Sequence, residues 1–407
     1  MTGITSVPRA AAAEPGAAVR VLVVDDSAVV RGAVGRMLDA DPDLTVVATA
    51  GNGRQALEAL ARTPADVVVL DVEMPEMDGL TALPRILTQH PTTRVLMLSV
   101  HGGRGEEVTV RALALGAADF VCKPRAGGRS GALPAVGTSR GGGTAADAYA
   151  EELTHKVRAL GRSAQRLRRQ PSAGDGLAPR KSPLGGPEQR PAGPTASRPP
   201  RPPRAVQPAR LLAIAASTGG PVALAELLTA IPAPVSVPVL VTQHMPPSFT
   251  RLLATRLAAS TGHPCTEAVD GELLRPGHVY VAPGDYHMLA ERRGGAVRVR
   301  LNQEPPVQHC RPAADPMFAS VAAAYGPGVL AVVLTGMGHD AREGSAAIVR
   351  GGGRVLAQDE ASSVVWGMPG AVAQAGLADA VLPIVEIAAH IAACCAPGRR
   401  PPPARVP

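Results

Sequence analysis

Three residue types that form serine-hydrolase triads lie in the second half of the chain. Ser217, His244 and Asp340 each follow a short apolar run. A serine hydroxyl is a weak nucleophile, and a histidine held by a carboxylate is the base that activates it. The three residues therefore predict acyl-transfer chemistry if the fold brings them together.

The turn after Ser217 also has a chemical use. Thr218-Gly-Gly-Pro221 follows it, and glycines allow a tight turn while proline suits the first position of a helix. Free N–H groups at a helix N-terminus favour a developing oxyanion. The order Ser, His, Asp disfavours an α/β-hydrolase, and so does the context Ala215-Ala-Ser-Thr-Gly219, which replaces the GxSxG that surrounds the nucleophile of that family.

A second group of polar residues lies in the first half, again after apolar runs. Asp25, Asp26 and Asp71 supply three carboxylates, which repel each other unless a cation neutralises them. Mg²⁺, a hard cation with oxygen ligands, meets that need. Ser99 and Lys123 follow two further runs and suit a phosphoryl group on one carboxylate.

Alternating strands and helices must position these residues. In the first half, apolar runs predict five buried parallel strands with helices between them, at 19–24, 44–49, 66–72, 94–100 and 119–122. This order predicts a flavodoxin-like doubly wound α/β domain. The carboxyl ends of parallel strands share one edge, where ligands bind.

The second half repeats this pattern without an internal sequence repeat. Strands are expected at 211–216, 237–242 and 329–335, with short additional ones at 279–281 and 297–301. We therefore expect a second doubly wound, parallel α/β domain. The expected boundaries are a disordered leader (1–18), a first domain (19–170) with a Gly-rich insert (126–143), a linker (171–208), a second domain (209–396) and a disordered tail (397–407).

The net charge of +7 comes from two segments of the chain. The Pro- and Arg-rich linker carries six basic and two acidic residues, and the tail adds three arginines, so the remainder sums to zero. Only 2% of the residues are aromatic, which is poor material for stacking on bases. A nucleic-acid regulator stays open as a disfavoured alternative.

The five cysteines, without CxxC spacing, and the lack of a signal peptide predict a cytoplasmic protein. No apolar run approaches the roughly 18 residues of a membrane span, so we expect no membrane insertion.

The first domain resembles a response-regulator receiver domain. The motifs are Asp25-Asp-Ser27, Leu70-Asp-Val-Glu-Met-Pro75 and Lys123-Pro124. The resemblance implies that Asp71 is the phosphoacceptor and that Asp25, Asp26 and the Glu73 backbone carbonyl bind Mg²⁺. It implies further that Lys123 pairs with the phosphate, with Ser99 as switch hydroxyl and Phe120 as switch aromatic.

The second domain resembles the CheB family of chemotaxis methylesterases. The motifs are Ala216-Ser-Thr-Gly-Gly-Pro221, Gln243-His-Met-Pro246 and Leu334-Thr-Gly-Met-Gly-His-Asp340. The resemblance implies a Ser217, His244 and Asp340 triad without a cofactor, and backbone N–H groups of Thr218 and Met337 as oxyanion donors.

The family's activity is hydrolysis of glutamate methyl esters, and deamidation of certain glutamines, on chemoreceptors. The resemblance implies activation by phosphate from a chemotaxis-type histidine kinase. Two positions depart from the family, which usually has glycine where this chain has Ala215 and Ala341. A catalytically weak scaffold or phosphate sink therefore stays open as the alternative.

Overall fold

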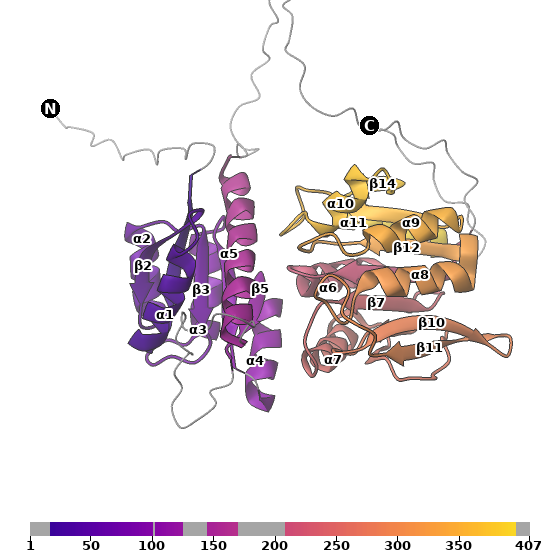
Figure 1. Cartoon of the computed structure of the whole chain (residues 1–407), viewed down its shortest axis with the longest axis horizontal. Coiled ribbons are helices and arrows are strands. Elements are labelled where there is room, and N and C mark those ends of the chain that lie inside the picture. Colours follow the sequence, from indigo (N-terminus) through magenta and orange to yellow (C-terminus); the bar gives the residue numbers. More distant parts are fainter. Residues whose placement is uncertain (1–16, 101, 125–144, 170–207, 396–407) are drawn as a thin grey trace, which may run out of the picture. The chain divides into compact units, whose positions relative to one another are not determined.

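The computed structural model describes residues 17–100, 102–124, 145–169 and 208–395. The predicted leader, Gly-rich insert, linker and tail lie outside these residues, apart from residues 17, 18 and 208. The described residues form two α/β domains (Figure 1).

The receiver-like domain contains a five-stranded parallel sheet in the order β2-β1-β3-β4-β5. The strands are β1 (Val19–Val24), β2 (Leu44–Ala50), β3 (Val67–Asp71), β4 (Arg94–Ser99) and β5 (Asp119–Cys122). The helices are α1 (Ala28–Asp39), α2 (Gly53–Arg62), α3 (Gly79–Gln89), α4 (Gly103–Ala114) and α5 (Ala145–Arg169). The predicted flavodoxin-like arrangement is confirmed.

Polar side chains fix where three of these helices begin. Ser27, Asn52 and Asp78 each accept a hydrogen bond from a backbone N–H in the first turn of α1, α2 and α3. Such caps satisfy N–H groups that have no partner within the helix. The loop between β1 and α1 holds Asp25 and Asp26, whereas Asp71 is the last residue of β3.

Helix α5 packs against the start of β1. At Gly161 in this helix, an added Cβ would lie 2.0 Å from Cγ1 of the buried Val19. A glycine at this position lets helix and strand approach closely. Helix α5 therefore belongs to this domain.

The second domain contains a seven-stranded parallel sheet in the order β14-β13-β12-β6-β7-β9-β8. The strands are β6 (Leu211–Ala216), β7 (Val239–Gln243), β8 (Cys265–Glu267), β9 (Val279–Val281), β12 (Val329–Val333), β13 (Arg354–Gln358) and β14 (Ala380–Leu382). A separate antiparallel hairpin consists of β10 (His287–Arg293) and β11 (Ala296–Asn302).

Helices cover both faces of this sheet (Figure 1). They are α6 (Gly220–Ala230), α7 (Phe249–Thr261), α8 (Ala314–Tyr325), α9 (Arg342–Arg350), α10 (Met368–Gln374) and α11 (Ile384–Cys395), with a 3₁₀ turn at Gly326–Gly328. The helices α8 and α9 and the hairpin share a core with the sheet, centred on Met317, Phe318 and Val333. The predicted doubly wound fold is confirmed.

Several strand limits differ from the sequence-based expectation. Strand β7 starts at Val239 because Pro238 has no N–H to donate to a ladder. Strand β12 stops at Val333, and the N–H of Thr335 binds the Gln358 side chain instead. Strands β8, β10, β13 and β14 were not predicted, since they are short or carry charged residues.

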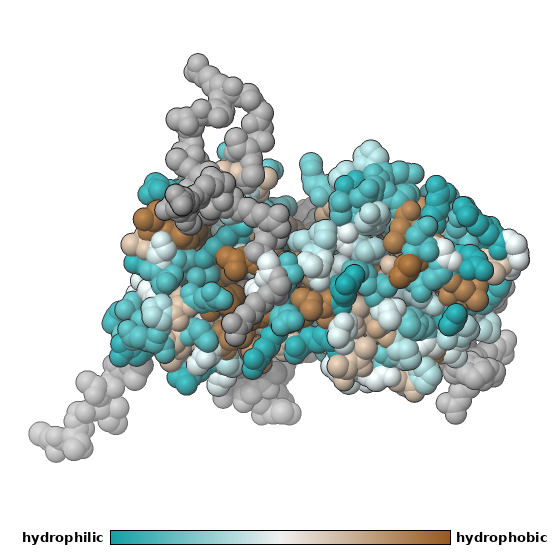
Figure 2. Space-filling view, turned by 90° about the horizontal axis from the view of Figure 1, so that it is seen from below, coloured by the Kyte–Doolittle hydropathy of each residue, from teal (hydrophilic) through white to brown (hydrophobic). Residues whose placement is uncertain are grey.

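Polar residues cover much of the surface. Figure 2 shows hydrophilic side chains over most of the face drawn, with hydrophobic side chains in smaller groups among them. Among the described residues, no helix has both the length and the apolar character needed to cross a membrane.

The Gly161 contact allows a test of receiver packing. We expect Gly161→Ala to lower the free energy of unfolding of this domain by about 1–3 kcal/mol, because the new methyl group meets Val19. Gly35→Ala is the matched control, since nothing lies within 4 Å of its added Cβ in α1. It should raise that energy by up to about 1 kcal/mol. Urea unfolding followed by circular dichroism measures both, and equal effects would contradict this packing.

Candidate active site

Asp340 is the carboxylate of the predicted triad. It lies between β12 and α9 and is buried. The backbone N–H groups of Ala314, Asp315 and Ala341 donate to its two oxygens over 2.6, 2.9 and 2.8 Å. Burial opposes its ionisation, but these N–H groups and His244 outweigh burial and lower its pKa. The first turn of α8 thus holds a buried anion.

His244 follows β7 and points its ring at this anion. Its Nε2 lies 2.7 Å from Asp340 Oδ2, and its Nδ1 lies 3.5 Å from the sulfur of Cys310. Burial disfavours the charged imidazolium, yet the contacts with Asp340 and Cys310 outweigh burial and raise the pKa of His244 to about 10. The structure therefore brings two of the three predicted triad residues into direct contact.

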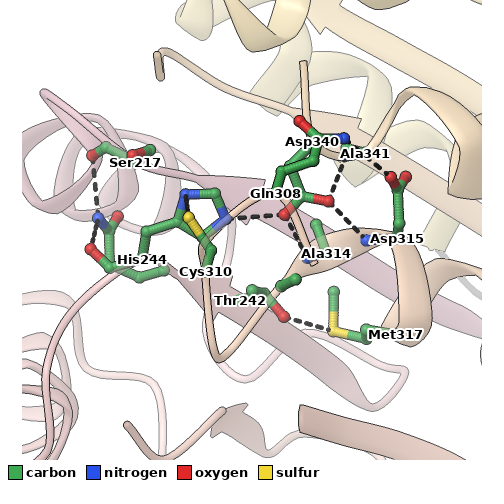
Figure 3. A network of polar contacts seen from close by, with 12 residues as sticks. Ser217, Thr242, His244, Gln308, Cys310, Ala314, Asp315, Met317, Asp340 and Ala341 are labelled. Carbon is green, nitrogen blue, oxygen red and sulfur yellow. Dashed lines mark hydrogen bonds and ion pairs between the residues drawn. The ribbon is translucent and has the colours of Figure 1, made fainter. Parts of the chain in front are cut away.

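Ser217 lies in the turn between β6 and α6. Gln243 connects this turn to the histidine, because its amide Nε2 donates to the backbone carbonyls of Ser217 and His244 over 2.9 and 3.4 Å. In the view of Figure 3 the His244 ring lies between Ser217 and Asp340. The Ser217 hydroxyl makes no hydrogen bond to any described residue, so no Ser–His bond is present.

The two expected oxyanion donors lie in neighbouring turns. The Thr335 hydroxyl donates to the Thr218 carbonyl over 2.9 Å, which ties the turn after Ser217 to the segment before Met337. Within the described part of the chain, neither the N–H of Thr218 nor that of Met337 has a hydrogen-bond acceptor.

The acidic cluster of the receiver-like domain forms as expected. Carboxylate oxygens of Asp25, Asp26 and Asp71 lie within 4.8 Å of one another. Lys123 Nζ lies 2.8 Å from Asp25 and 2.8 Å from Asp71. Burial raises the pKa of Asp71 to about 6, although Lys123 opposes this, and Asp25 adds repulsion. A cluster of hard oxygen ligands is typical of a magnesium site in a receiver domain.

The other expected receiver residues are Ser99, Phe120 and Glu73. The Ser99 hydroxyl lies 2.6 Å from the Thr109 hydroxyl in α4, and no bond joins it to Asp71. Phe120 is buried in β5, and Glu73 is exposed two positions after Asp71. Their switch and metal-binding roles stay predictions.

Comparison with known proteins identifies both domains. The model of the response regulator receiver domain matches residues 21–129, and that of CheB methylesterase matches residues 212–391. A Rhodospirillum rubrum protein named protein-glutamate methylesterase/protein-glutamine glutaminase 1 is 47% identical over 389 residues, covering 92% of this chain and 95% of that protein. The chain belongs to the CheB family.

A second relative agrees with this assignment. Protein-glutamate methylesterase/protein-glutamine glutaminase 2 of Caulobacter vibrioides is 46% identical over 374 residues, covering 92% of this chain and 98% of that protein. The crystal structure of the Thermotoga maritima CheB methylesterase catalytic domain is 38% identical, with a TM-score of 0.45, and covers 45% of this chain and 97% of that one.

The two departures from the family pattern are accommodated differently. Ala215 is fully buried in β6 and keeps its ladder contacts. Ala341 adopts φ of 75°, a left-handed conformation that favours glycine, and its methyl group is buried. Its N–H still donates to Asp340, so the site retains its geometry at the expense of local strain.

Sequence reasoning did not assign roles to Gln243, Cys310 or Asp315. Asp315 lies at the start of α8, and burial raises its pKa to about 6 against the hydrogen bond from the Gly344 N–H, with Asp340 adding repulsion. Gln243 stands next to His244 in the quoted motif, and Cys310 precedes Arg311-Pro312. Only Gln243 lies in a motif quoted above, so a signal was available for it, whereas Cys310 and Asp315 lie outside those motifs.

The strained residue yields a stability prediction. We expect Ala341→Val to lower the free energy of unfolding of the second domain by about 2–4 kcal/mol, since a β-branched side chain suits neither a positive φ nor a filled core. Ala346→Val in α9 is the matched control at a half-buried position of normal helix geometry, and it should cost under about 1 kcal/mol. Similar losses in guanidinium unfolding for both variants would refute strain at Ala341.

Proposed function

We propose that this CheB-family chain hydrolyses methyl esters of glutamate side chains on chemoreceptors and deamidates specific glutamines, as the names of its relatives describe. The observation that carries the catalytic assignment is the His244–Asp340 pair, anchored to α8 and bonded through Gln243 to the turn of Ser217. In this mechanism Ser217 is the nucleophile, His244 the general base and Asp340 the orienting carboxylate.

The chemistry proceeds in two acyl-transfer steps. As Ser217 Oγ attacks the ester carbonyl, its proton passes to His244, and the oxyanion is stabilised by the N–H groups of Thr218 and Met337. Each such donor contributes about 3–4 kcal/mol. The bond to the methoxy group then breaks, methanol leaves with the proton from His244, and water releases the glutamate by the same route. Deamidation differs only in that ammonia leaves.

Regulation is proposed to come from the receiver domain. A histidine kinase of the chemotaxis type would supply phosphate to Asp71, with Lys123, Ser99 and Phe120 in the roles that the family implies. We retain the predicted limits of 19–170 for the receiver and 209–396 for the hydrolase, with a linker between them. We assign the chain to the cytoplasm, as its five cysteines without CxxC spacing predict.

The residues present fit a magnesium ion. Three carboxylates lie close together, and Lys123 forms ion pairs with two of them, Asp25 and Asp71. One lysine does not balance three negative charges, so the site favours a further cation. Asp25, Asp26 and the Glu73 carbonyl would hold the ion, beside the phosphoacceptor Asp71. When bound, Mg²⁺ neutralises charge during phosphoryl transfer. We propose no cofactor for the hydrolase domain.

Hydrolysis by the full chain tests this function. Methanol release from methylated receptor membranes should rise about 5- to 150-fold when an acyl phosphate donor is added. Ser217→Ala should reduce turnover at least about 1000-fold, because the nucleophile is lost. Asp71→Asn should abolish the stimulation, since no phosphoryl group can be accepted.

Matched controls separate these effects from folding. Ser260→Ala changes an exposed serine of α7, and Asp78→Asn changes the exposed cap of α3, so both should respond like the wild type. Wild-type turnover in Ser217→Ala would refute the triad. No turnover in the wild type or in any variant would instead favour the alternative that the protein is a catalytically weak scaffold.

Magnesium should stabilise the receiver domain in a pH-dependent manner. The pKa of Asp71 is raised to about 6, so its carboxylate is ionised and repelled above that pH, and a cation relieves the repulsion. Thermal unfolding should therefore show a higher Tm with MgCl₂ at pH 7.5, corresponding to about 2.7 kcal/mol at 100 times Kd, and little shift at pH 5. Asp25→Asn should remove the shift and Asp78→Asn should keep it. An undiminished shift in Asp25→Asn would rule out this site.

A further inference from the structure

The two ring nitrogens of His244 have different partners. Nε2 is 2.7 Å from Asp340 Oδ2, and Nδ1 is 3.5 Å from Cys310 Sγ (Figure 3). Because Asp340 occupies Nε2, the nitrogen that accepts a proton from Ser217 must be Nδ1. The sulfur of Cys310 therefore faces the working nitrogen of the general base.

A strained turn presents this sulfur. Val307 and Cys310 exchange two backbone hydrogen bonds of 3.1 and 2.9 Å, which close a tight turn. Its two central residues, Gln308 and His309, have φ of 50° and 64°. Positive φ at both central positions is typical of a type I′ turn, which usually contains glycine or asparagine. The chain thus maintains an unfavourable backbone conformation directly beside the catalytic pair.

Neighbouring contacts fix the turn on both sides. Arg311 follows Cys310, and its guanidinium binds Asp285 at 2.6 Å and the carbonyls of Gln303 and Glu304. On the other side, the Gln308 amide lies 3.5 Å from Asp315 Oδ2. The position of Cys310 is consequently set by bonds that do not involve its own side chain.

We propose that Cys310 is a positioning residue of the hydrolase, whose thiol holds the His244 ring with Nδ1 on the side of the reacting serine. This proposal rests on the proposed role of His244 as the general base. In the resting site the thiol occupies Nδ1, and it gives way to the Ser217 hydroxyl when an ester binds.

The groups that face His244 agree with this assignment. Asp340 approaches from the segment after β12, and Asp315 stands behind it at the start of α8. Cys310 approaches from the turn, while His309 at the tip is exposed. Both Asp340 and Cys310 raise the pKa of His244 against the effect of its burial. Removing the thiol therefore lowers the pKa of His244, and the neutral base becomes available at lower pH.

The test compares full-length wild type, Cys310→Ala, Cys310→Ser and Cys122→Ala. The kcat/KM for methanol release is measured against pH, and KM and kcat are separated. We expect the acid limb of the Cys310→Ala profile to move about one unit to lower pH, with kcat at the optimum reduced about 3- to 10-fold and KM within twofold of wild type. Cys310→Ser, whose hydroxyl can still bond to Nδ1, should restore kcat to within about threefold. Cys122→Ala, in β5 of the receiver, should match wild type.

A second measurement is independent of turnover. Ring proton signals of His244, assigned with His244→Gln, are titrated by NMR in the full chain carrying Ser217→Ala, with and without Cys310→Ala. A pKa of His244 that falls on removal of the thiol supports the proposal. It does so even if no methyl ester is hydrolysed, because absence of hydrolysis would refute only the proposed function. Superimposable profiles and an unchanged pKa in the Cys310 variants would overturn it.

Discussion

The hydrolase site depends on one interaction, the binding of the Asp340 carboxylate at the N-terminus of α8. Three backbone N–H groups and one imidazole N–H satisfy a carboxylate that is almost fully buried. An isolated carboxylate at this depth would be protonated, because burial alone strongly disfavours its charge. The helix N-terminus makes a permanent anion possible, and the anion in turn determines which histidine nitrogen is left for catalysis.

The two domains solve opposite electrostatic problems with the same fold. Each gathers polar residues at the carboxyl ends of parallel strands. In the receiver, the carboxylates of Asp25 and Asp71 face each other and Lys123, so that negative charge accumulates and a cation is needed. In the hydrolase, backbone N–H groups and the His244 ring compensate the charge of the Asp340 carboxylate. The first arrangement suits a transferable phosphoryl group, and the second suits a fixed orienting charge.

Much of this organisation could be predicted from the sequence, because it depends on local patterns. Short apolar runs followed by Asp71, Ser217 or His244 marked the strand ends that carry chemistry, and the quoted motifs identified the family. The hairpin strand β10 was missed because Glu291, Arg292 and Arg293 hide its apolar face.

Long-range contacts explain the rest of what sequence reasoning missed. The bridge formed by Gln243 and the contact of Cys310 with His244 join segments that only the folded chain brings together. The left-handed conformation of Ala341 follows from the need to direct its N–H to Asp340, which a residue type cannot reveal.

The turn at Gln308 and His309 has a consequence for how the thermal stability of this protein can be increased. Its backbone is one that glycine adopts without penalty, yet the two side chains differ in what they contribute. Gln308 contacts Asp315, whereas His309 is exposed and has no contact that the site uses. A substitution at the tip of the turn that relieves the positive φ of His309 is therefore expected to raise thermal stability without altering any group that contacts the His244 ring.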